Sequence, residues 1–243
     1  HTNIWSSELS KLIANAFLAQ RISSINSISA LCETTGAEIK EVVKAIGSDK
    51  RIGQKFLSPS PGFGGSCFKK DILNLVYLCK YYGLYEVAEF WYQVVKINEY
   101  QKERFLKKIV DKFEGNLSGK TISLLGWAFK AKTNDSRESA AIDIAKSLLK
   151  HNAKIIIYDS LVKRDKIIND LKPIYSSHKD LITIENNFSD RLKYTDAAVI
   201  STEDEQFLNV KFKNTFVFDG RNFIKPHQLI SGSKLISLDK SDD

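Results

Sequence analysis

The sequence predicts an α/β protein in which an all-helical domain is followed by a Rossmann-like domain with a doubly wound parallel sheet. Two observations predict this division. Up to about residue 114, apolar residues recur at steps of three and four, which is the period of an amphipathic helix. Beyond Gly115, short β-rich runs alternate with helical runs, a pattern typical of right-handed βαβ crossovers. We therefore expect domains at residues 1–114 and 115–243.

The first domain is expected to contain four helices, with glycines ending the second and third. Their ranges are Glu8–Leu31, Glu38–Ile46, Asp71–Tyr82 and Tyr85–Phe113. The last of them is long enough to span one domain and lead into the next. Between the second and third helices, residues 48–66 lose all periodicity and gather prolines and glycines. A loop of this length in a compact domain is usually functional.

In the second domain, five β-rich runs are expected to form strands, and a helix at Ala140–Lys150 follows the first of them. The strands are Thr121–Leu125, Lys154–Tyr158, Ala197–Ser201, Thr215–Phe218 and Lys234–Leu238. Asp135 and Glu138 are expected to form a capping box for the helix. Arg137 and Arg221 are expected at carboxyl ends of strands, where doubly wound sheets bind ligands. Each could hold a carboxylate or phosphate, or simply be solvated.

Composition excludes several classes of protein. With 43% hydrophobic and 27% charged residues, and only 4 Pro and 12 Gly, the chain is neither disordered nor collagen-like. No run approaches the roughly 20 apolar residues of a membrane span, and the first residues have no secretory signal pattern. We therefore expect a soluble, cytoplasmic protein without a membrane partner. The absence of Met indicates a fragment, a processed form or an engineered chain.

The basic side chains and the cysteines also limit the possible partners. The net charge is +7, but lysines and arginines alternate with acids, as in Lys102-Glu103-Arg104, so no nucleic-acid partner is expected. The three cysteines fit neither a zinc site nor a disulfide framework, and the histidines have no metal-ligand spacing. We expect reduced thiols and no metal.

The most informative segment runs from Pro59 to Asp71. Its glycines let the main chain approach a ligand closely. Cys67 is expected at or just before the first turn of a helix, where free N–H groups and the helix dipole favour a thiolate, and Lys69 and Lys70 act in the same direction. A thiolate beside a backbone-lined cradle is the arrangement of a covalent nucleophile. The alternative is a small packing residue, the interpretation that suits the other two cysteines.

Three further side chains are candidates for the same chemistry. Lys11 and Asn15 lie four residues apart and so share a helical face, where one could donate to an oxyanion and the other could orient a hydroxyl or water. Both could equally be ordinary surface residues. Asp71 could steer a hydrolytic water or only stabilise the helix dipole. No GxGxxG occurs in the sequence, so a standard dinucleotide-binding turn is not expected.

Three blocks of sequence resemble the eukaryotic UDP-glucose 6-dehydrogenase family, in the family's order and over essentially the whole chain. They are Trp5–Leu12 with Asn15–Phe17, Gly62–Phe68 with Lys70–Asp71, and Gly126–Lys130 with Arg137–Ser139. The resemblance implies a central helical domain and a carboxyl-terminal UDP-binding domain. It also implies that the family's amino-terminal NAD-binding Rossmann domain is missing, so this polypeptide should not turn over alone.

The resemblance implies an activity as well. The family oxidises the C6 alcohol of UDP-glucose to a carboxylate in two NAD-dependent steps, giving UDP-glucuronate. By this resemblance Cys67 holds the substrate carbon first as a thiohemiacetal and then as a thioester. Lys11 stabilises the oxyanion or exchanges protons, Asn15 places a water or substrate oxygen, and Asp71 assists hydrolysis.

The same resemblance implies two sets of binding residues and a homo-oligomer formed through the helical domain, in which Arg51 reaches a neighbouring subunit's site. The UDP-glucose set is Lys11, Asn15, Arg51, Ser58, Pro59, Ser60, Pro61, Gly62, Phe63, Gly64, Phe129, Lys130 and Arg221. The NAD set is Cys67, Phe68, Lys69, Lys70 and Arg137. Two alternatives stay open: a non-catalytic assembly module, and a dehydrogenase of another nucleotide sugar such as a UDP- or GDP-linked mannose derivative.

Overall fold

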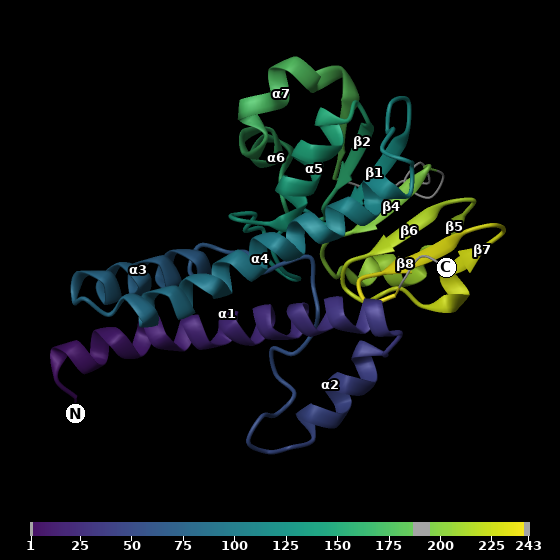
Figure 1. Cartoon of the computed structure of the whole chain (residues 1–243). Helices are drawn as coiled ribbons and strands as arrows, with labels where there is room; N and C mark the ends of the chain where they lie inside the picture. The colour runs from purple at the N-terminus through teal and green to yellow at the C-terminus, as the bar shows by residue number, and fades with distance from the viewer. Residues whose placement is uncertain (1, 187–194, 241–243) are drawn as a thin grey trace.

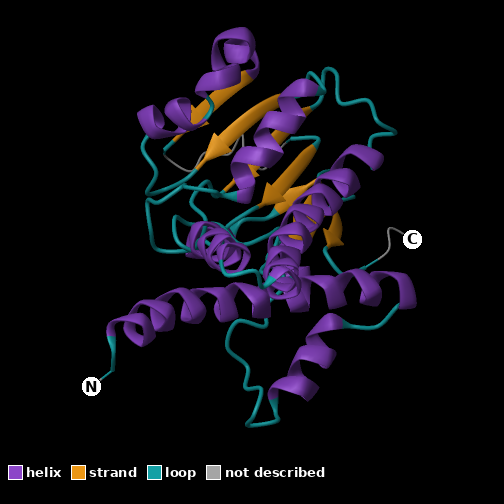
Figure 2. Cartoon of the chain, turned by 60° about the vertical axis from the view of Figure 1, so that its left-hand side comes forward, coloured by secondary structure: helices purple, strands orange, loops and turns teal. Residues whose placement is uncertain are grey.

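A computed structural model describes residues 2–186 and 195–240. The predicted domains begin at residue 1 and end at residue 243, and these outer ends (residue 1 and residues 241–243) lie outside the described residues. A helical part comes first and an α/β part follows, as Figures 1 and 2 show from two sides. The fold class predicted from the sequence is therefore confirmed. In the described ranges no helix combines the length and the apolar character that crossing a membrane requires.

The four predicted helices of the first part are all present, with ends shifted by a few residues. They are α1 (Ile4–Thr35), α2 (Ile39–Gly47), α3 (Phe68–Tyr81) and α4 (Tyr85–Asp111). Helix α1 begins after Asn3, whose side chain accepts a hydrogen bond from the Ser6 N–H, and it ends at Gly36, which has a φ of 76°. Helices α3 and α4 pack on each other and along α1 (Figure 1). Their shared core includes Ala16, Ile72 and Val95.

Helix α4 joins the two parts of the chain. Its first half contributes Val94 and Val95 to the helical core, whereas Phe105 and Ile109 from its second half are fully buried in the core of the sheet. A 27-residue helix is about 40 Å long, which is enough to serve both cores. The buried side chains between the two apolar stretches include Asn98 and Gln101.

The second part is built on a six-stranded parallel sheet with the order β3-β2-β1-β4-β6-β8. The strands are β1 (Thr121–Leu125), β2 (Lys154–Tyr158), β3 (Ile182–Glu185), β4 (Ala197–Ile200), β6 (Phe216–Asp219) and β8 (Lys234–Ser237). The chain runs outward from β1 to β3 and then continues from β4 in the other direction, so strand order reverses between β1 and β4. In doubly wound sheets this reversal marks the ligand-binding edge.

The described residues form further helices, short turns and a second, small sheet around these six strands. The helices are α5 (Ala140–Lys150), α6 (Arg164–Asp170) and α7 (Lys172–His178), and the short 3₁₀ turns are Lys179–Leu181, Glu205–Asn209 and Pro226–Gln228. Strands β5 (Phe212–Lys213) and β7 (Leu229–Ile230) form a separate two-stranded parallel sheet. All five predicted strands are present, whereas β3, β5 and β7 were not predicted.

The expected capping box of α5 is wrong. The cap is Ser139, whose hydroxyl accepts from the Ala141 N–H at 3.3 Å. The reason lies in the preceding turn, where Glu138 has a φ of 54° and cannot begin the helix. The Asp135 carboxylate instead binds Arg137 at 2.7 Å.

Candidate functional site

A cavity of about 440 Å³ lies where the helical part meets the turns at the edge of the sheet. Its walls come from the loop that leads into α3 and from the turns after β1 and β6. Ten of the residues proposed from the sequence line it: Ser58, Ser60, Gly62, Phe63, Gly64, Cys67, Phe68, Phe129, Lys130 and Arg221. The structure thus brings together residues that are up to about 160 positions apart in the sequence.

The loop approaches the sheet turns so closely that only glycine fits at Gly64. A Cβ added at Gly64 would lie 2.4 Å from the backbone oxygen of Glu138 and 2.9 Å from the Cβ of Phe129. The next residue, Gly65, donates its N–H to the backbone oxygen of Arg137 at 2.7 Å. The glycines therefore allow direct backbone contact between the two parts of the chain.

Arg221 forms one wall of the cavity and ties strand ends together. Its Nε donates to the backbone oxygen of Ser201 at 2.7 Å, and its Nη2 donates to that of Phe129 at 3.1 Å. Burial lowers the pKa of Arg221 and outweighs the opposing effects of Glu203 and Asp219. A guanidinium keeps its charge under these conditions, so it provides a fixed positive group on the cavity wall.

Cys67 is the N-cap residue of α3, and its side chain is exposed to the cavity. Its Sγ lies 3.6 Å from the Ser66 hydroxyl, and its backbone oxygen accepts from the Asp71 N–H at 2.8 Å. Cys32 and Cys79 are buried, and burial raises the pKa of each thiol. Of the three cysteines, Cys67 alone lines a wall of this cavity.

A polar cluster joins α1 to α3 one helical turn beyond Cys67. The Asp71 carboxylate accepts from Asn15 Nδ2 at 2.6 Å and binds Lys70 Nζ at 2.8 Å. Burial by itself would raise the pKa of Asp71, but the hydrogen bonds from Lys70 and Asn15, with the charge of Lys11, hold that pKa below its ordinary value. Asp71 is therefore an ionised carboxylate that is only 1% exposed. None of these four side chains lines the 440 Å³ cavity.

A second cavity, of about 680 Å³, is lined by α3 and by the turn before α5. Lys69, Lys70 and Arg137 all line it. A hydrogen bond to Asp71 raises the pKa of Lys70, and one to Asp135 raises the pKa of Arg137. The negative charge that Cys67 carries when it is ionised adds a smaller effect to both. Two exposed cations thus lie close to Cys67.

Lys69 differs from these two cations because carboxylates already surround its ammonium group. Glu99 and Glu138 each lie 3.2 Å from Lys69 Nζ. Partial burial lowers the pKa of Lys69, but the two carboxylates outweigh this and raise it overall. Its charge is therefore largely balanced within the protein.

Five proposed substrate residues line neither cavity: Lys11 and Asn15 of the polar cluster, and Arg51, Pro59 and Pro61. The Arg51 side chain is 88% exposed and binds Asp49 at 2.6 Å. Pro59 and Pro61 are buried, and Pro61 packs so closely on Gly220 that a Cβ there would lie 2.5 Å from its ring. The structure therefore gives the two prolines a packing position and leaves Arg51 at the surface of this chain.

Sequence reasoning missed Asn26, Asn98 and Gln101, whose side chains are at most 1% exposed and bind the backbone of the loop. For Asn98 and Gln101, the sequence held one indication of burial: both lie on the apolar stripe of α4 between Val94 and Phe105. A polar residue on the buried stripe of a helix needs a hydrogen-bond partner.

Sequence models of two domains of one family match the chain. The central domain of the UDP-glucose/GDP-mannose dehydrogenase family matches residues 5–100, and the family's UDP binding domain matches residues 123–226. Together they cover most of the sequence. The chain belongs to the UDP-glucose/GDP-mannose dehydrogenase family, which confirms the resemblance found in the sequence.

Curated relatives agree with this assignment. The chain is 48% identical to UDP-glucose 6-dehydrogenase of Drosophila melanogaster over 244 residues, covering 98% of this chain and 50% of that protein. It is 51% identical to the UDP-glucose 6-dehydrogenase of Gallus gallus over 235 residues, covering 92% of this chain and 48% of that protein. The chain therefore spans about half the length of the curated relatives it matches.

Solved structures show the same arrangement. A UDP-glucose dehydrogenase from Pyrobaculum islandicum superposes with a TM-score of 0.84 at 28% identity, over 97% of this chain and 51% of that one. An NDP-N-acetyl-D-galactosaminuronic acid dehydrogenase from Methanosarcina mazei gives a TM-score of 0.77 at 22% identity, over 97% of this chain and 51% of that one. The second likeness concerns the fold alone.

Proposed function

We propose that this chain is the substrate-binding part of an NAD-dependent UDP-glucose 6-dehydrogenase, which oxidises UDP-glucose to UDP-glucuronate through a covalent bond to Cys67. The observation that carries the proposal is the 440 Å³ cavity, because it joins the exposed Cys67 to the glycine loop and to Arg221, whose side chain is only 14% exposed. This volume is within the range of small-molecule sites. Both curated relatives quoted above are named UDP-glucose 6-dehydrogenase.

The two walls of the cavity bind different parts of a nucleotide sugar. The loop Ser58–Gly64 wraps the sugar diphosphate with backbone groups, and Phe129 and Lys130 contact the uridine diphosphate from the turn after β1. The Lys130 ammonium lies 5.4 Å from the centre of the Phe129 ring, so an aromatic face and a positive charge occur together. Arg221 completes the pocket with a second positive charge opposite the diphosphate.

Cys67 allows the second oxidation to follow the first. Loss of a hydride and a proton from the C6 alcohol gives an aldehyde, and the Cys67 thiolate adds to its carbon to form a tetrahedral thiohemiacetal. Loss of a second hydride from that carbon gives a thioester. Water then attacks the thioester carbon, the bond to Sγ breaks, and the carboxylate leaves with the thiol restored. Bound NAD supplies the acceptor for each of the two hydrides.

The cluster beside Cys67 supports the proton steps of this sequence. Lys11 donates a hydrogen bond to the oxyanion or exchanges its proton, as a cation near a developing negative charge would. Asn15 orients the substrate oxygen or the attacking water. Asp71 is ionised and tied to Asn15 at 2.6 Å, so it fixes the Asn15 amide and assists hydrolysis.

The 680 Å³ cavity suits a dinucleotide. Its side chains Lys70 and Arg137 are 69% and 63% exposed, and Ser66 and Lys69, the sequence neighbours of Cys67 and Phe68, also line it. These two cations would hold the phosphates of NAD and bring its reactive ring toward Cys67. Lys69 supports the wall of the cavity through its carboxylate partners, so it contributes less charge to the ligand.

We propose further that residues 1–114 and 115–243 are a central helical domain and a UDP-binding domain, and that the helical domain forms a homo-oligomer in the cytoplasm. Large apolar side chains remain exposed on α1, α3 and α4, including Trp5, Phe17 and Tyr81. Arg51, on an exposed turn, would reach the site of a neighbouring subunit. Light scattering of the chain at several concentrations tests the oligomer.

Titration calorimetry of the chain with UDP-glucose tests the main proposal. We expect one site per chain and a higher melting temperature in the presence of UDP-glucose. GDP-mannose serves as the matched control ligand, and tighter binding of GDP-mannose would favour a different nucleotide sugar. A stable dimer that no nucleotide sugar binds would favour the non-catalytic assembly module instead.

A further inference from the structure

Three buried side-chain amides hold the loop that lines the substrate cavity. They are Asn26 on α1 and Asn98 and Gln101 on α4, with exposures of 0%, 1% and 0%. The loop, from Pro59 to Gly64, has no regular secondary structure, so a strand or helix partner does not satisfy its backbone groups. The amides supply those partners from the side of the loop that faces the helices.

The hydrogen bonds fall on two loop residues. Ser60 donates its N–H to Asn26 Oδ1 at 2.9 Å, and its backbone oxygen accepts from Gln101 Nε2 at 2.9 Å. Phe63 donates its N–H to Asn98 Oδ1 at 2.7 Å, and its backbone oxygen accepts from Asn98 Nδ2 at 3.1 Å. All four backbone polar groups of these two residues are therefore bound by buried amides.

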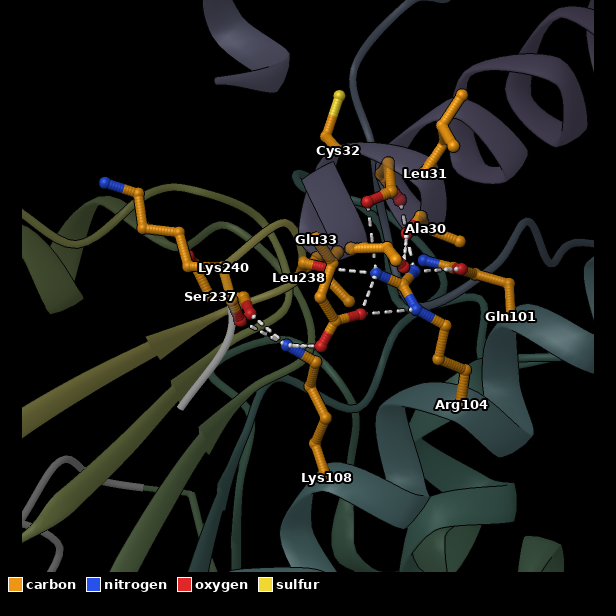
Figure 3. Close-up of polar contacts among 12 residues, drawn as sticks. Ala30, Leu31, Cys32, Glu33, Gln101, Arg104, Lys108, Ser237, Leu238 and Lys240 are labelled. Atoms are coloured by element: carbon orange, nitrogen blue, oxygen red, sulfur yellow. Dashed lines mark hydrogen bonds and ion pairs between the residues drawn. The ribbon is translucent and has the colours of Figure 1, made fainter. Parts of the chain in front are cut away.

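Arg104 sets the orientation of the Gln101 amide. As Figure 3 shows, its guanidinium reaches Gln101 as well as Glu33 on α1. Arg104 Nη1 donates to Gln101 Oε1 at 2.8 Å, so the amide oxygen is fixed on the arginine side. The amide nitrogen must then face Ser60, whose backbone oxygen needs a donor. A reversed amide would place two oxygens against each other.

We propose that Asn26, Asn98 and Gln101 are positioning residues that hold the Pro59–Gly64 loop in the shape that receives a nucleotide sugar, with Arg104 orienting Gln101. The proposal rests on the proposed function of the cavity. Ser60 and Phe63 carry the hydrogen bonds on one side and line the cavity on the other, so a shift of their backbone changes the binding surface. The amides themselves line neither of the two cavities described above.

Two variants of Gln101 distinguish the effect of its hydrogen-bond donor from the effect of its side-chain volume. Gln101→Glu keeps the size and an acceptor for Arg104 but removes the donor to Ser60, and Gln101→Met keeps only the approximate volume. Gln93→Met is the matched control, because Gln93 lies exposed on the same helix and binds Glu89, away from the loop. Each protein is compared with wild type well below its melting temperature, after far-UV circular dichroism has shown that it is folded.

Two measurements decide the proposal. We expect both Gln101 variants to raise the Kd for UDP-glucose about tenfold, because each leaves the Ser60 carbonyl without its buried donor. Hydrogen–deuterium exchange of the peptide covering residues 57–66 should speed up about tenfold in the same variants. Gln93→Met should change neither quantity.

Gln101 variants that lose thermal stability but bind UDP-glucose within twofold of wild type would have a structural role only, and the proposal would be wrong. Unchanged exchange in the loop would overturn it as well. If the wild-type chain bound no nucleotide sugar, the proposed function would fail, whereas the exchange data would still decide whether the amides hold the loop. The failures of the two proposals can therefore be told apart.

Discussion

Arg221 donates a hydrogen bond from Nη2 to the backbone oxygen of Phe129 at 3.1 Å, and this bond joins the turn after β6 to the turn after β1. The same guanidinium donates from Nε to Ser201 at the end of β4, the strand that lies between those two. One side chain thus links three adjacent strand ends at the mouth of the cavity. The position of Phe129 in the cavity wall depends on it.

Arg221→Lys should weaken UDP-glucose binding about tenfold, because a lysine ammonium cannot reproduce the planar, multidirectional donation of a guanidinium. Titration calorimetry measures the change. Arg164→Lys is the matched control, since Arg164 also donates to a backbone oxygen, that of Ile184 at 3.2 Å, but on the edge strand β3, which does not line the cavity. Equal affinities of wild type and Arg221→Lys would contradict the assignment of Arg221 to the substrate wall.

Iodoacetamide should alkylate Cys67 at least about 50-fold faster than Cys32 or Cys79 at pH 7.5, because only an accessible thiolate reacts quickly. Cys67 is exposed, whereas the other two thiols are buried and their pKa values are raised by burial. Mass spectrometry of proteolytic peptides over time gives the three rates. Bound UDP-glucose should slow the reaction of Cys67. Rapid labelling of all three cysteines in the folded chain would show that the cavity does not set the reactivity of Cys67.

Asp71→Asn should flatten the pH dependence of stability on the acid side. The hydrogen bonds from Lys70 and Asn15 hold the pKa of Asp71 below its ordinary value in the folded chain. A carboxyl with a depressed folded pKa stabilises the fold above its unfolded pKa of about 3.9, and this stability is lost as the pH falls through the folded pKa. Urea unfolding at a series of pH values from 6 downward measures the effect.

In that series the wild type should lose more stability than Asp71→Asn as the pH falls below about 4. Asp143→Asn is a suitable control, because Asp143 is also an ion-paired carboxylate, 2.9 Å from Lys102 Nζ, but its side chain is 50% exposed. Parallel curves for wild type and Asp71→Asn would mean that Asp71 has the same pKa in the folded and unfolded chains.

The sequence was sufficient for elements whose local pattern and tertiary environment agree. The apolar runs at Thr121–Leu125 and Lys154–Tyr158 became neighbouring central strands with the predicted bounds, because both faces of a central parallel strand are buried. Strand β3 was missed because Ile182–Glu185 follows a 3₁₀ turn without glycine or proline. Its strand character comes from pairing with β2, which no local pattern records.

The candidate site could be predicted from the sequence only in part, because several of its contacts also depend on the tertiary fold. The glycine-rich setting of Cys67 is a local signal, so the sequence located the loop and the start of the helix. The contact between Gly64 and Phe129 depends on packing between the two parts of the chain. Gln101 looks like an ordinary polar residue of a long helix until the loop is folded against it. Long-range hydrogen bonds of this kind follow from the tertiary fold, not from spacing.

Gly64→Ala should displace the loop from the turn after β1, since the new Cβ would lie 2.4 Å from the backbone oxygen of Glu138. Overpacking of this kind costs about 1–3 kcal/mol of stability. We also expect loss of UDP-glucose binding by calorimetry, because the loop and Phe129 line one cavity. Gly119→Ala is the control: apart from its chain neighbours, nothing lies within 4 Å of a Cβ added there, and its φ of 77° costs stability without changing the site. A Gly64→Ala chain with unchanged affinity would contradict the close fit.

Glu33→Gln should strongly destabilise the junction between the helical and sheet parts. The Glu33 carboxylate binds Arg104 Nη2 at 2.6 Å and Lys108 Nζ at 2.5 Å. Arg104 also donates to the backbone oxygen of Leu238, just beyond β8 (Figure 3). Lys108 donates to the backbone oxygens of Ser237, the last residue of β8, and of Lys240. The two cationic side chains are only 10% and 9% exposed. Removing their shared counter-ion leaves two nearby positive charges in a poorly solvated place, so the free energy of unfolding should fall by about 3 kcal/mol.

Urea denaturation of Glu33→Gln measures that loss, and Glu89→Gln provides the matched control. Glu89 binds Lys96 at 3.1 Å on the exposed face of α4, where water screens both charges, so its removal should change stability far less. Because Arg104 also orients Gln101, the Glu33 variant should in addition weaken UDP-glucose binding at temperatures where it stays folded. Equal destabilisation by the two variants would mean that the buried cations are neutralised by solvent, and that α1, α4 and β8 are held together by apolar packing alone.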